Sequence, residues 1–457
     1  RSGGCKVKDV KATIIGIVVF GLISLPAFSA EYKSDEVIVK FASGSAMSKS
    51  VVSEGESRSM VIAVDDADEA IRTLADNEGI EYAEPNYIIE AESIPEDWPY
   101  LENEWEDIDL SGAWDLIETS GAGQRVIVAV IDSGVDLDHP DLADILIEGH
   151  DFANNDSTPE DDTGHGTRVT GILAALGNNG IGVAGVAWNV DIAVMPLKFM
   201  KNNDGKTTGS LSDAVNAIYY AVDHGASIIN ASWGFDTYSY SLGEAIKYAR
   251  KKGVLFIASA GNSSQDNDSH SHYPSNYTYD NVIAVAAMNR YGTLASFSNY
   301  GETSVDIAAP GEGLKTTNIN GGYSSWVSGT SYATPFVSAV AAMVISQSPD
   351  LSYSSVRGVI LNSAVVDDSY SELNSKGCVN AYNALTAEEY SFEESSMASG
   401  SSNQMDSSML ALAMAGEGSG SKGCMIDSAR NAGSASLVLI VISMIVLFQV
   451  SRVKHLE

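Results

Sequence analysis

The stretch RVIVAVIDSGVDLDHPDL, residues Arg125 to Leu142, decides the fold of this chain. Its first part is apolar at consecutive positions, which is typical of a strand with both faces buried. Asp132 follows that strand directly, and Gly134 then marks a turn. Open parallel sheets bind ligands at the carboxyl ends of their strands, so Asp132 is a candidate functional carboxylate. A plain turn aspartate is the alternative interpretation.

Further apolar runs follow, each rich in Val, Ile and Ala, and they are DIAVMPLKF, ASIINASWG, VLFIASAGN and NVIAVAAM. The amphipathic segment LSDAVNAIYYAVDHG separates the first two of these runs and predicts a helix. Strands that alternate with helices indicate right-handed crossover connections. The sequence therefore predicts an α/β fold with a mostly parallel sheet buried between helices.

A small mixed unit precedes this block. This unit, from Glu36 to Ile89, contains the alternating strand EVIVKF, the helical pattern ADEAIRTLADNEG and the returning strand IEYAEPNYIIE. The unit is too short for a large core of its own. Residues 92–105 contain prolines and acids without a clear period, which predicts a linker with a cleavage region.

The amino-terminal end has the pattern of an export signal. Lys6, Lys8 and Lys11 precede the apolar run 12–25, and small residues follow it. This order predicts a secretory signal peptide over residues 1–30. An uncleaved signal anchor is the alternative, and both predict export.

The carboxyl-terminal end changes composition abruptly. Residues 389–433 are dominated by Ser, Gly, Ala, Met and acids, which predicts a flexible linker. Residues 434–457 combine an apolar run with Arg452 and Lys454, which favours a membrane segment with a cytoplasmic basic flank. Together with the pair Gly423–Cys424 they are similar to a three-part sorting signal, and a plain membrane anchor is the rival.

Charge and cysteine content limit the partners of the chain. Its 457 residues carry a formal net charge of −34, and phosphate binding needs clustered basic charge, so no nucleic-acid partner is expected. A salty or cold environment is one hypothesis for this acidity, and solubility alone is the simpler one. The cysteines Cys5, Cys378 and Cys424 form no disulfide framework. Cys378 and Cys424 remain open to pairing, and a buried or modified thiol is equally compatible.

The segment DDTGHGTRVTGILAAL places His165 between two glycines at the opening of an apolar helix. Glycine on both sides lets another backbone or a substrate approach the imidazole closely. Histidine is also the side chain whose proton affinity lies near neutral pH. Alone it would be an ambiguous histidine, but none of the other six has this setting.

The segment GTSYATPF, Gly329 to Phe336, precedes the apolar run VSAVAAMVISQ. Pro335 is tolerated in the first turn of a helix, which predicts a helix that begins at about Ser331. A serine there lies beside unpaired N–H donors at the positive end of the helix dipole. It is either an N-cap or a nucleophile.

The occurrence of these residues together favours a catalytic role over a purely structural one. A serine nucleophile needs a base, and the base needs a third group that orients it, which the order Asp132, His165, Ser331 supplies. The strand FIASAGNSS ends with Asn262, whose amide can donate to an oxygen that becomes negative during acyl transfer. The order Asp, His, Ser is one of three known for such triads.

Residues 105–388 resemble the subtilisin-like serine proteases, the subtilases of peptidase family S8. The resemblance rests on five motifs in the family's order: VIDSGVDLDHPDL, GHGTRVTGI, NASWG, ASAGN and GTSYATPFVSA. It implies a three-layer subtilisin-like catalytic domain over residues 94–388. It also implies that Asp132 orients, His165 acts as base and then acid, Ser331 attacks, and Asn262 with the Ser331 N–H binds the oxyanion.

The resemblance further implies two backbone segments beside the specificity pocket, to which an extended peptide adds as a strand. Their residues are Ser232, Trp233, Gly234, Ser259, Ala260 and Gly261. Trp233 and Tyr273 suggest aromatic pocket walls, and no acidic pair selects basic residues. Broad specificity with an apolar preference is therefore expected for peptide or protein substrates.

Five residues depart from the family pattern, and none of them is a reacting group. Arg168 and Thr170 replace the usual histidine and alanine after the catalytic histidine, and Tyr332, Thr334 and Phe336 replace the commoner Met, Ala and His beside the nucleophile. They put the pocket shape and the helix packing in question.

A calcium site is implied by the same resemblance, because oxygen ligands suit this cation. Its ligands would be the Asp141 carboxylate, the Asn179 side chain, and the carbonyls of Ile181 and Val183. A Gly-rich turn without metal is the alternative. Asp306 is a candidate for a weaker second site.

Residues 31–93 resemble the family's inhibitor-type propeptide, through VIVKF and EYAEPNY. A permanent accessory domain is the alternative. The expected protein is a secreted, monomeric endopeptidase that is made as a zymogen with its own propeptide as inhibitor, and is held at the cell surface. A catalytically silent binding module is the competing class, and an esterase or peptide ligase would use the same chemistry.

Overall fold

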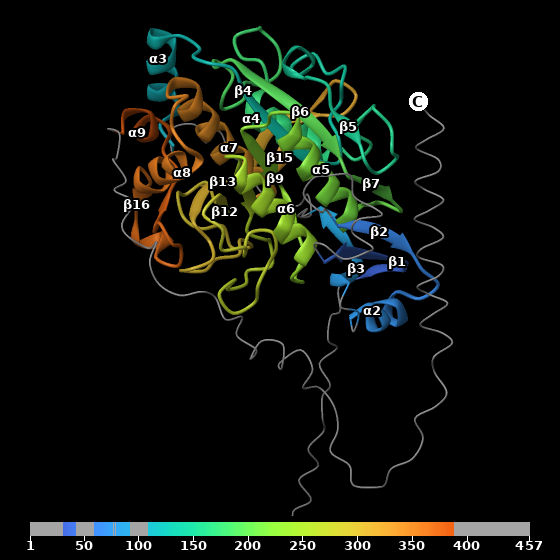
Figure 1. Cartoon of the computed structure of the whole chain (residues 1–457). Helices are drawn as coiled ribbons and strands as arrows, with labels where there is room; N and C mark the ends of the chain where they lie inside the picture. Colours follow the sequence, from blue (N-terminus) through green and yellow to red (C-terminus); the bar gives the residue numbers. More distant parts are fainter. Residues whose placement is uncertain (1–30, 43–58, 76, 78, 92–107, 388–457) are drawn as a thin grey trace, which may run out of the picture.

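The computed structural model describes residues 31–42, 59–75, 77, 79–91 and 108–387 (Figure 1). Two groups of elements are visible: a large block with a central sheet, and a smaller unit at its side. The predicted signal peptide, the segment 92–105, the linker 389–433 and the segment 434–457 lie outside the described residues.

The large block is built on a sheet whose strand order is β16-β17-β13-β12-β11-β9-β4-β6-β5. All neighbours in this order are parallel except β16 and β17. The strands are β4 (Val126–Asp132), β5 (His150–Asp151), β6 (Ile192–Lys198), β9 (Ile228–Ala231), β11 (Leu255–Ser259), β12 (Val282–Met288), β13 (Ile307–Pro310), β16 (Val365–Val366) and β17 (Gly377–Cys378). The five apolar runs of the sequence form β4, β6, β9, β11 and β12, which confirms the parallel α/β prediction.

Helices cover both faces of this sheet, because alternate residues of each strand are apolar on opposite sides. On β4, Val128 and Val130 pack into one core, and Ala129 and Ile131 pack into the other. The first core is completed by α3 (Leu110–Ser120), α4 (His165–Ala174), α7 (Thr330–Gln347), α8 (Tyr353–Asn362) and α9 (Ala381–Thr386). The second is completed by α5 (Leu211–Asp223) and α6 (Tyr240–Lys251). The result is the predicted three-layer arrangement.

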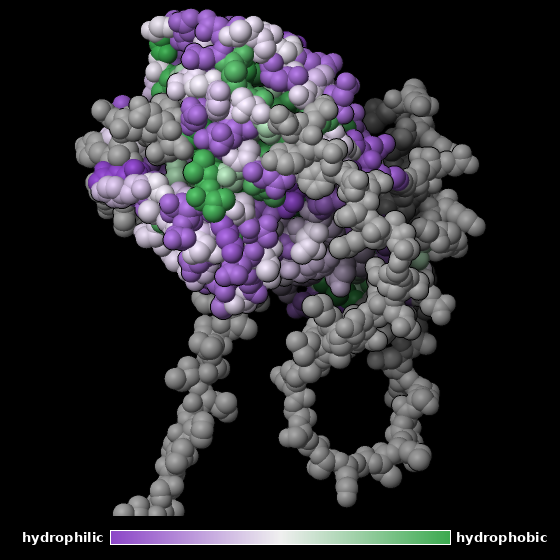
Figure 2. All heavy atoms as spheres, turned by 90° about the vertical axis from the view of Figure 1, so that its left-hand side faces the viewer, coloured by the Kyte–Doolittle hydropathy of each residue, from purple (hydrophilic) through white to green (hydrophobic). Residues whose placement is uncertain are grey.

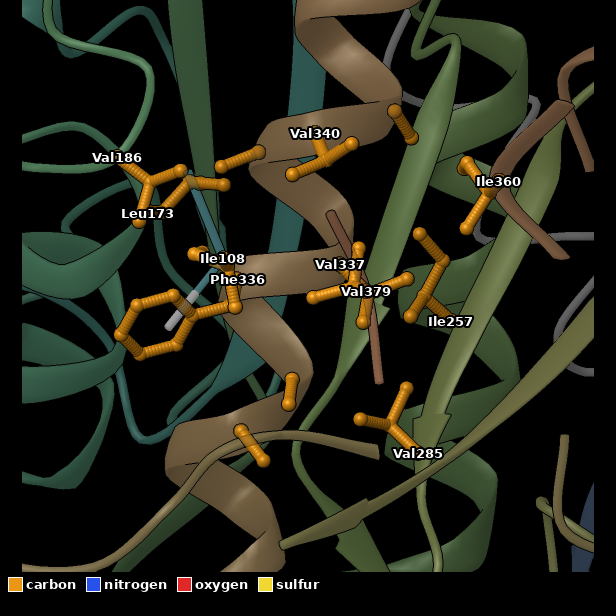
Figure 3. Packing of buried hydrophobic residues seen from close by; sticks show 14 of the residues in the cluster. Ile108, Leu173, Val186, Ile257, Val285, Phe336, Val337, Val340, Ile360 and Val379 are labelled. Atoms are coloured by element: carbon orange, nitrogen blue, oxygen red, sulfur yellow. The ribbon is translucent and has the colours of Figure 1, made fainter. Parts of the chain in front are cut away.

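Helix α7 runs through the first core and is buried on nearly all sides. Phe336, Val337 and Val340 project from it toward Leu173, Ile257 and their neighbours (Figure 3). Pro335 is the sixth residue of this helix, so its predicted place in the first turn is wrong. The antiparallel pair β14 (Leu314–Asn318) and β15 (Gly322–Val327) precedes the helix.

The smaller unit contains β1 (Tyr32–Phe41), β2 (Met60–Ala63), α2 (Ala67–Ala75) and β3 (Ile80–Ala91). Strand β1 pairs antiparallel with both β2 and β3, and α2 packs on them over a small apolar cluster. The sequence predicted β1, α2 and β3, and it missed β2.

The sheet of the smaller unit continues into the large block. The carboxyl end of β3 pairs antiparallel with β8 (Lys206–Ser210) and with β10 (Trp233–Gly234). Strand β8 in turn forms a hairpin with β7 (Met200–Asn203). Residues 88–91 therefore occupy the position of a middle strand between two edges of the large block.

Two polar side chains of β3 accept hydrogen bonds from N–H groups at the N-termini of helices in the large block. Glu84 is 5% exposed, and its carboxylate accepts hydrogen bonds from the N–H groups of Tyr240 and Ser241 at 2.8 and 2.7 Å, at the start of α6. Asn86 is fully buried, and its Oδ1 accepts from the Ser212 N–H at the start of α5 at 2.9 Å. The first N–H groups of a helix have no internal partner, so β3 supplies acceptors that the helices lack.

The surface of the molecule is mostly hydrophilic on the face shown in Figure 2, with a limited hydrophobic area. This agrees with the acidic composition of the chain. The edge strand β16 adds apolar exposure, since Val365 and Val366 are 42% and 68% exposed. Within the part of the chain that the structure describes, no helix combines the length and apolarity that a membrane crossing requires.

The carboxylate of Glu84 is expected to strengthen the attachment of the smaller unit to the large block. We expect Glu84→Ala to weaken its attachment by about 1–3 kcal/mol, because buried N–H donors at the start of α6 lose their acceptor. The measurement is the dissociation constant between the two units after the segment 92–107 has been cut. Glu69→Ala removes the same charge from an exposed position of α2 and should leave that constant unchanged. Equal constants for both variants would contradict the capping role.

Candidate active site

The predicted chemical residues gather at one edge of the parallel sheet. Strands β11, β9 and β4 are neighbours, and they end beside Asn262, Ser232 and Asp132 respectively. Helix α7 begins near the same edge, because the N–H of Thr330 donates to the Asn262 side chain at 2.9 Å. Parallel strands bring their carboxyl ends to one side, so residues remote in sequence meet there.

Asp132 and His165 form a buried hydrogen-bonded pair. His165 Nδ1 lies 2.8 Å from Asp132 Oδ1, and the same oxygen accepts the Ser133 N–H at 2.7 Å. Burial lowers the pKa of His165, but the charge and hydrogen bond of Asp132, helped by the charge of Asp161, outweigh burial and the opposing Arg168. The pKa of His165 is therefore raised above its ordinary value, and a protonated imidazole is stabilised at this place.

Two glycines allow the imidazole of His165 to lie close to the end of β4. Gly164 precedes α4 with φ of 86°, a left-handed conformation that suits glycine. A Cβ atom on Gly166 would lie only 2.1 Å from the Gly134 carbonyl oxygen. Helix α4 can therefore start against the end of β4, as the motif Gly-His-Gly predicts.

Asp161 organises the loop before α4, and the sequence analysis did not identify it. Its carboxylate, 6% exposed, accepts the N–H groups of Gly164 and Thr167 at 2.9 and 3.0 Å. It also accepts the Ser133 hydroxyl at 2.9 Å, and that hydroxyl accepts the Gly166 N–H at 2.9 Å. The loop after Asp132 and the start of α4 are thus tied to one carboxylate. An acid four residues before the histidine was the available signal.

Lys198 is a second residue that sequence analysis did not identify. It is 2% exposed, and its Nζ donates to the carbonyls of Ser133 and Glu160 at 3.0 and 2.8 Å and to Asp162 Oδ1 at 2.7 Å. A buried ammonium group is stable only when its protons are paired, and here three acceptors surround it. Lys198 therefore holds the two loops that flank Asp132 and His165.

Ser331 is the second residue of α7. The helix starts at Thr330, and Gly329 is its N-cap with φ of 150°. The alternative interpretation of Ser331 as the N-cap is therefore wrong. The ring of Tyr332 lies 5.4 Å from the His165 ring, which places the imidazole beside this first turn. Among the described residues, His165 Nε2 is buried without a hydrogen-bond partner.

The Asn262 amide is oriented by its neighbours. Its Oδ1 accepts the N–H and the hydroxyl of Thr330 at 2.9 and 3.0 Å. Its Nδ2 is buried, and no hydrogen-bond partner for it lies within the described part of the chain. An amide locked through its oxygen with its N–H₂ unengaged can donate to an incoming oxygen.

The two predicted backbone segments, 232–234 and 259–261, lie side by side because β9 and β11 are neighbours. The prediction of an aromatic wall at Trp233 is wrong. Its side chain is fully buried, donates to the Ile131 carbonyl at 2.8 Å and packs on Phe199 at 5.0 Å. The alternation of side chains along β9 and β10 turns this ring into the core, although its backbone stays available to β3.

The second predicted wall, Tyr273, lies in a tyrosine cluster, with its ring 4.9 Å from that of Tyr277. A side chain that lies against both segments is that of His272. Cβ atoms on Gly234 and Gly261 would lie 2.1 and 3.3 Å from its ring. No sequence pattern indicates His272, because its approach to these glycines depends on the loop that carries it.

The residues that depart from the family pattern are accommodated by packing. Tyr332 and Phe336 are buried in the first core, and the Thr334 hydroxyl donates to the Thr330 carbonyl at 2.8 Å. The Arg168 carbonyl accepts the Thr316 hydroxyl at 2.7 Å. These contacts fix α4 and α7, while the Tyr332 ring and the Arg168 charge also lie near His165.

The four predicted calcium ligands lie together, but hydrogen bonds join them. Asn179 Nδ2 donates to Asp141 Oδ1 at 2.7 Å, and the Val183 N–H and the Tyr323 hydroxyl donate to Oδ2 at 3.1 and 2.9 Å. The Ile181 N–H donates to Asn179 Oδ1 at 3.0 Å. Oxygen and nitrogen of the Asn179 amide exchange by a half-turn, and a cation fits only when that oxygen faces Asp141.

No group of three or more His, Cys, Asp or Glu side chains in the described ranges is placed to hold a metal ion. The prediction of a second site at Asp306 is wrong. Arg357 donates to Asp306 Oδ1 at 2.6 Å, and the Ala284 N–H donates to Oδ2 at 2.9 Å. A guanidinium group thus takes the place that a cation would need. Cys378 is buried in β17, and Cys424 lies outside the described residues.

Known proteins share this arrangement. A model of the subtilase family, peptidase S8, matches residues 123–384, and a model of the fervidolysin N-terminal prodomain matches residues 24–86. The chain is 40% identical over 334 residues to a thermophilic serine proteinase of Bacillus sp. (strain AK1), which covers 72% of this chain and 79% of that protein. It is 39% identical over 273 residues to thermitase of Thermoactinomyces vulgaris, with 60% and 91% covered.

A solved structure is also similar: fervidolysin from Fervidobacterium pennivorans, described as a keratinolytic enzyme related to subtilisin. The TM-score is 0.64 at 28% identity, with 79% of this chain and 62% of that chain covered. The subtilase match spans more than half of the present chain. The chain therefore belongs to the subtilase family and is a subtilisin-like serine endopeptidase that carries a prodomain of the fervidolysin type.

Proposed function

We propose that this chain is a secreted endopeptidase that hydrolyses peptide bonds through an acyl-enzyme, with Asp132, His165 and Ser331 as its catalytic triad. The observation that carries the proposal is the buried contact of 2.8 Å between His165 Nδ1 and Asp132 Oδ1 beside the first turn of α7. A binding module has no need for an imidazole held in one tautomer by a desolvated carboxylate.

In the proposed reaction, Ser331 Oγ attacks the peptide carbonyl carbon while His165 Nε2 takes the hydroxyl proton. The C–N bond then breaks, and the imidazolium gives that proton to the leaving amine, which leaves an ester on Ser331. Water attacks the ester carbon while His165 Nε2 takes its proton; the ester C–O bond then breaks, the imidazolium returns that proton to Ser331 Oγ, and the acid product leaves. Asp132 keeps its charge throughout and stabilises the imidazolium.

The negative oxygen of each tetrahedral intermediate is assigned to Asn262 Nδ2 and the Ser331 N–H. Two findings support this assignment: Thr330 fixes the Asn262 amide through its oxygen, and Nδ2 is unengaged within the described residues. A donor aimed in advance stabilises the transition state without reorganisation. Both donors would belong to the same edge of the sheet as the attacking hydroxyl.

Residues 31–93 act as the propeptide and inhibitor of the same chain. Strand β3 lies between β8 and β10, which is the place where an extended peptide substrate would add. The end of β3 runs antiparallel to β10 toward Ser232, whose hydroxyl contacts the Ser331 carbonyl. Self-processing in the segment 92–100 would release the enzyme, which then takes peptide or protein substrates as a monomer.

Export and surface retention complete the proposal. The basic and apolar pattern of residues 1–30 supports a secretory signal, and residues 434–457 support a membrane anchor or a processed sorting signal. The domains proposed for the mature enzyme are the catalytic domain, residues 94–388, and the linker, residues 389–433. A zymogen protects the producing cell until export is complete.

Calcium is proposed as a structural ion of the loop around Asp141. The Asp141 carboxylate, the Asn179 side-chain oxygen, and the carbonyls of Ile181 and Val183 would hold it, and it would supply only rigidity to that loop. The support is that these residues already lie together, with Asp141 fully buried. No step of the reaction involves the ion.

The proposed triad is tested by Ser331→Ala in the full chain. Wild type should cut itself near residues 92–100 and react with a serine-directed phosphonate, because a desolvated base activates Ser331. The variant should stay full length and unlabelled. Protein mass and labelling are followed together, and a folded wild type that does neither is a binding module instead. Formation of new peptide bonds by the wild type would indicate a ligase, and cleavage of esters alone would indicate an esterase.

The pH dependence of the enzyme follows from the raised pKa of His165. The base must be neutral, so kcat/KM should fall as the pH drops through a pKa above the ordinary value of about 6.5. Asp161→Asn removes a negative charge that favours the imidazolium, so this acid limb should move to lower pH. Asp138→Asn, an exposed position, should leave the limb in place. A limb that stays fixed in Asp161→Asn contradicts this electrostatic account.

Calcium binding is tested on the Ser331→Ala protein, which cannot digest itself. Calcium at a hundredfold excess over its dissociation constant should raise the free energy of unfolding by about 2.7 kcal/mol relative to chelated protein. Thermal unfolding with calcium and with chelator measures this difference. Asp141→Asn should abolish it, and a difference that persists in that variant would place the ion elsewhere.

A further inference from the structure

The carbonyl of Ser331 lacks the usual helical donor. In an α-helix the N–H of residue i+4 donates to the carbonyl of residue i, and residue i+4 here is Pro335. Proline has no N–H, and its ring crowds the carbonyl four residues earlier. Because Ser331 is fully buried, its carbonyl needs a donor other than residue 335.

Ser232 supplies this partner. Its Oγ donates to the Ser331 carbonyl oxygen at 2.7 Å, and Ser232 is fully buried. Ser232 stands between β9 and β10, and β10 is the strand that pairs with the extended segment Glu90–Ala91. One hydroxyl thus joins the main chain of Ser331 to the strand on which a peptide would lie.

A chain of buried hydrogen bonds fixes that hydroxyl. Asn230 Nδ2 donates to Ser232 Oγ at 2.9 Å, and the Ser338 hydroxyl donates to Asn230 Oδ1 at 2.8 Å. Ser338 lies on α7, so the chain starts and ends on the same helix and crosses the sheet at β9. All these residues are fully buried, and each hydrogen bond fixes the orientation of the next polar group in the chain.

We propose that Ser232 is a positioning residue for the nucleophile. Its hydroxyl replaces the N–H that Pro335 cannot provide, and it thereby sets the first turn of α7 relative to the strand β10. The hydroxyl acts through the Ser331 main chain and touches no reacting atom. This inference rests on the proposed role of Ser331.

The first test is Ser232→Ala in the full chain, assayed on a small peptide substrate after maturation, with active sites counted by phosphonate labelling. Loss of one buried hydrogen bond predicts that kcat falls by about 5- to 100-fold, while KM changes little because β10 is intact. Ser346→Ala is the control. Ser346 lies on α7 and donates to the Ala122 carbonyl at 2.7 Å, far along the helix from Ser331, so its kcat should match wild type.

The second test is rescue. Pro335→Ala restores an N–H that can donate to the Ser331 carbonyl, so the double variant Ser232→Ala/Pro335→Ala should regain kcat over Ser232→Ala. A merely structural loss would not be repaired in this way. Ser232→Cys keeps a weaker donor of similar size, gives an intermediate kcat, and replaces the alanine variant if that one does not fold.

Several results would overturn the inference: an unchanged kcat in Ser232→Ala or Ser232→Cys, a loss that appears only in KM, or a Pro335→Ala effect that is the same with and without Ser232. The proposed function is judged separately. Wild-type protein that never labels with phosphonate refutes the role of Ser331 itself, whereas labelled wild type with a fully active Ser232→Ala refutes only the positioning role.

Discussion

A carboxylate without solvent exposure holds the imidazole of His165 at 2.8 Å, and the surrounding structure depends on this contact. Burying Asp132 is costly unless its charge is compensated by hydrogen bonds. Oδ1 is compensated by the Ser133 N–H and by the imidazole, whereas Oδ2 has no hydrogen-bond partner among the described residues. Asp161 and Lys198 hold the loops that bring Ser133 and His165 together. Much of the polar structure at the carboxyl edge of the sheet is thus explained as support for one desolvated pair.

The same edge serves two further purposes. Strands β8 and β10 offer their backbones to β3, and the turn between β9 and β10 carries Ser232 to the Ser331 carbonyl. A peptide that adds to β10 is therefore aligned with the first turn of α7 by the sheet itself. In the proposed function, the prodomain and a substrate would compete for these edges, because both would bind through main-chain hydrogen bonds that any sequence can make.

Sequence patterns predicted the parts that are local. Runs rich in Val, Ile and Ala predicted β4, β6, β9, β11 and β12, and the motifs around His165 and Ser331 placed both residues at helix starts. They could not give β2 or β13, whose pairing depends on distant strands, nor the direction of Trp233, which the pairing of β10 decides. The supporting roles of Asp161 and Ser232 could likewise not be predicted, because their partners, Ser133 and the Ser331 carbonyl, become neighbours only in the folded chain.

The caps that β3 places on α5 and α6 have a consequence for the lifetime of a processed molecule. Glu84 and Asn86 satisfy N–H groups of the catalytic block that have no helical acceptor, so they favour assembly of that block while both parts are covalently joined. Once the smaller unit has left, a molecule that unfolds must rebuild these helices without their template. If processing occurs as proposed, we expect the durability of the released enzyme to depend on the height of the unfolding barrier, which is a kinetic quantity, rather than on an equilibrium that the shortened chain can re-enter.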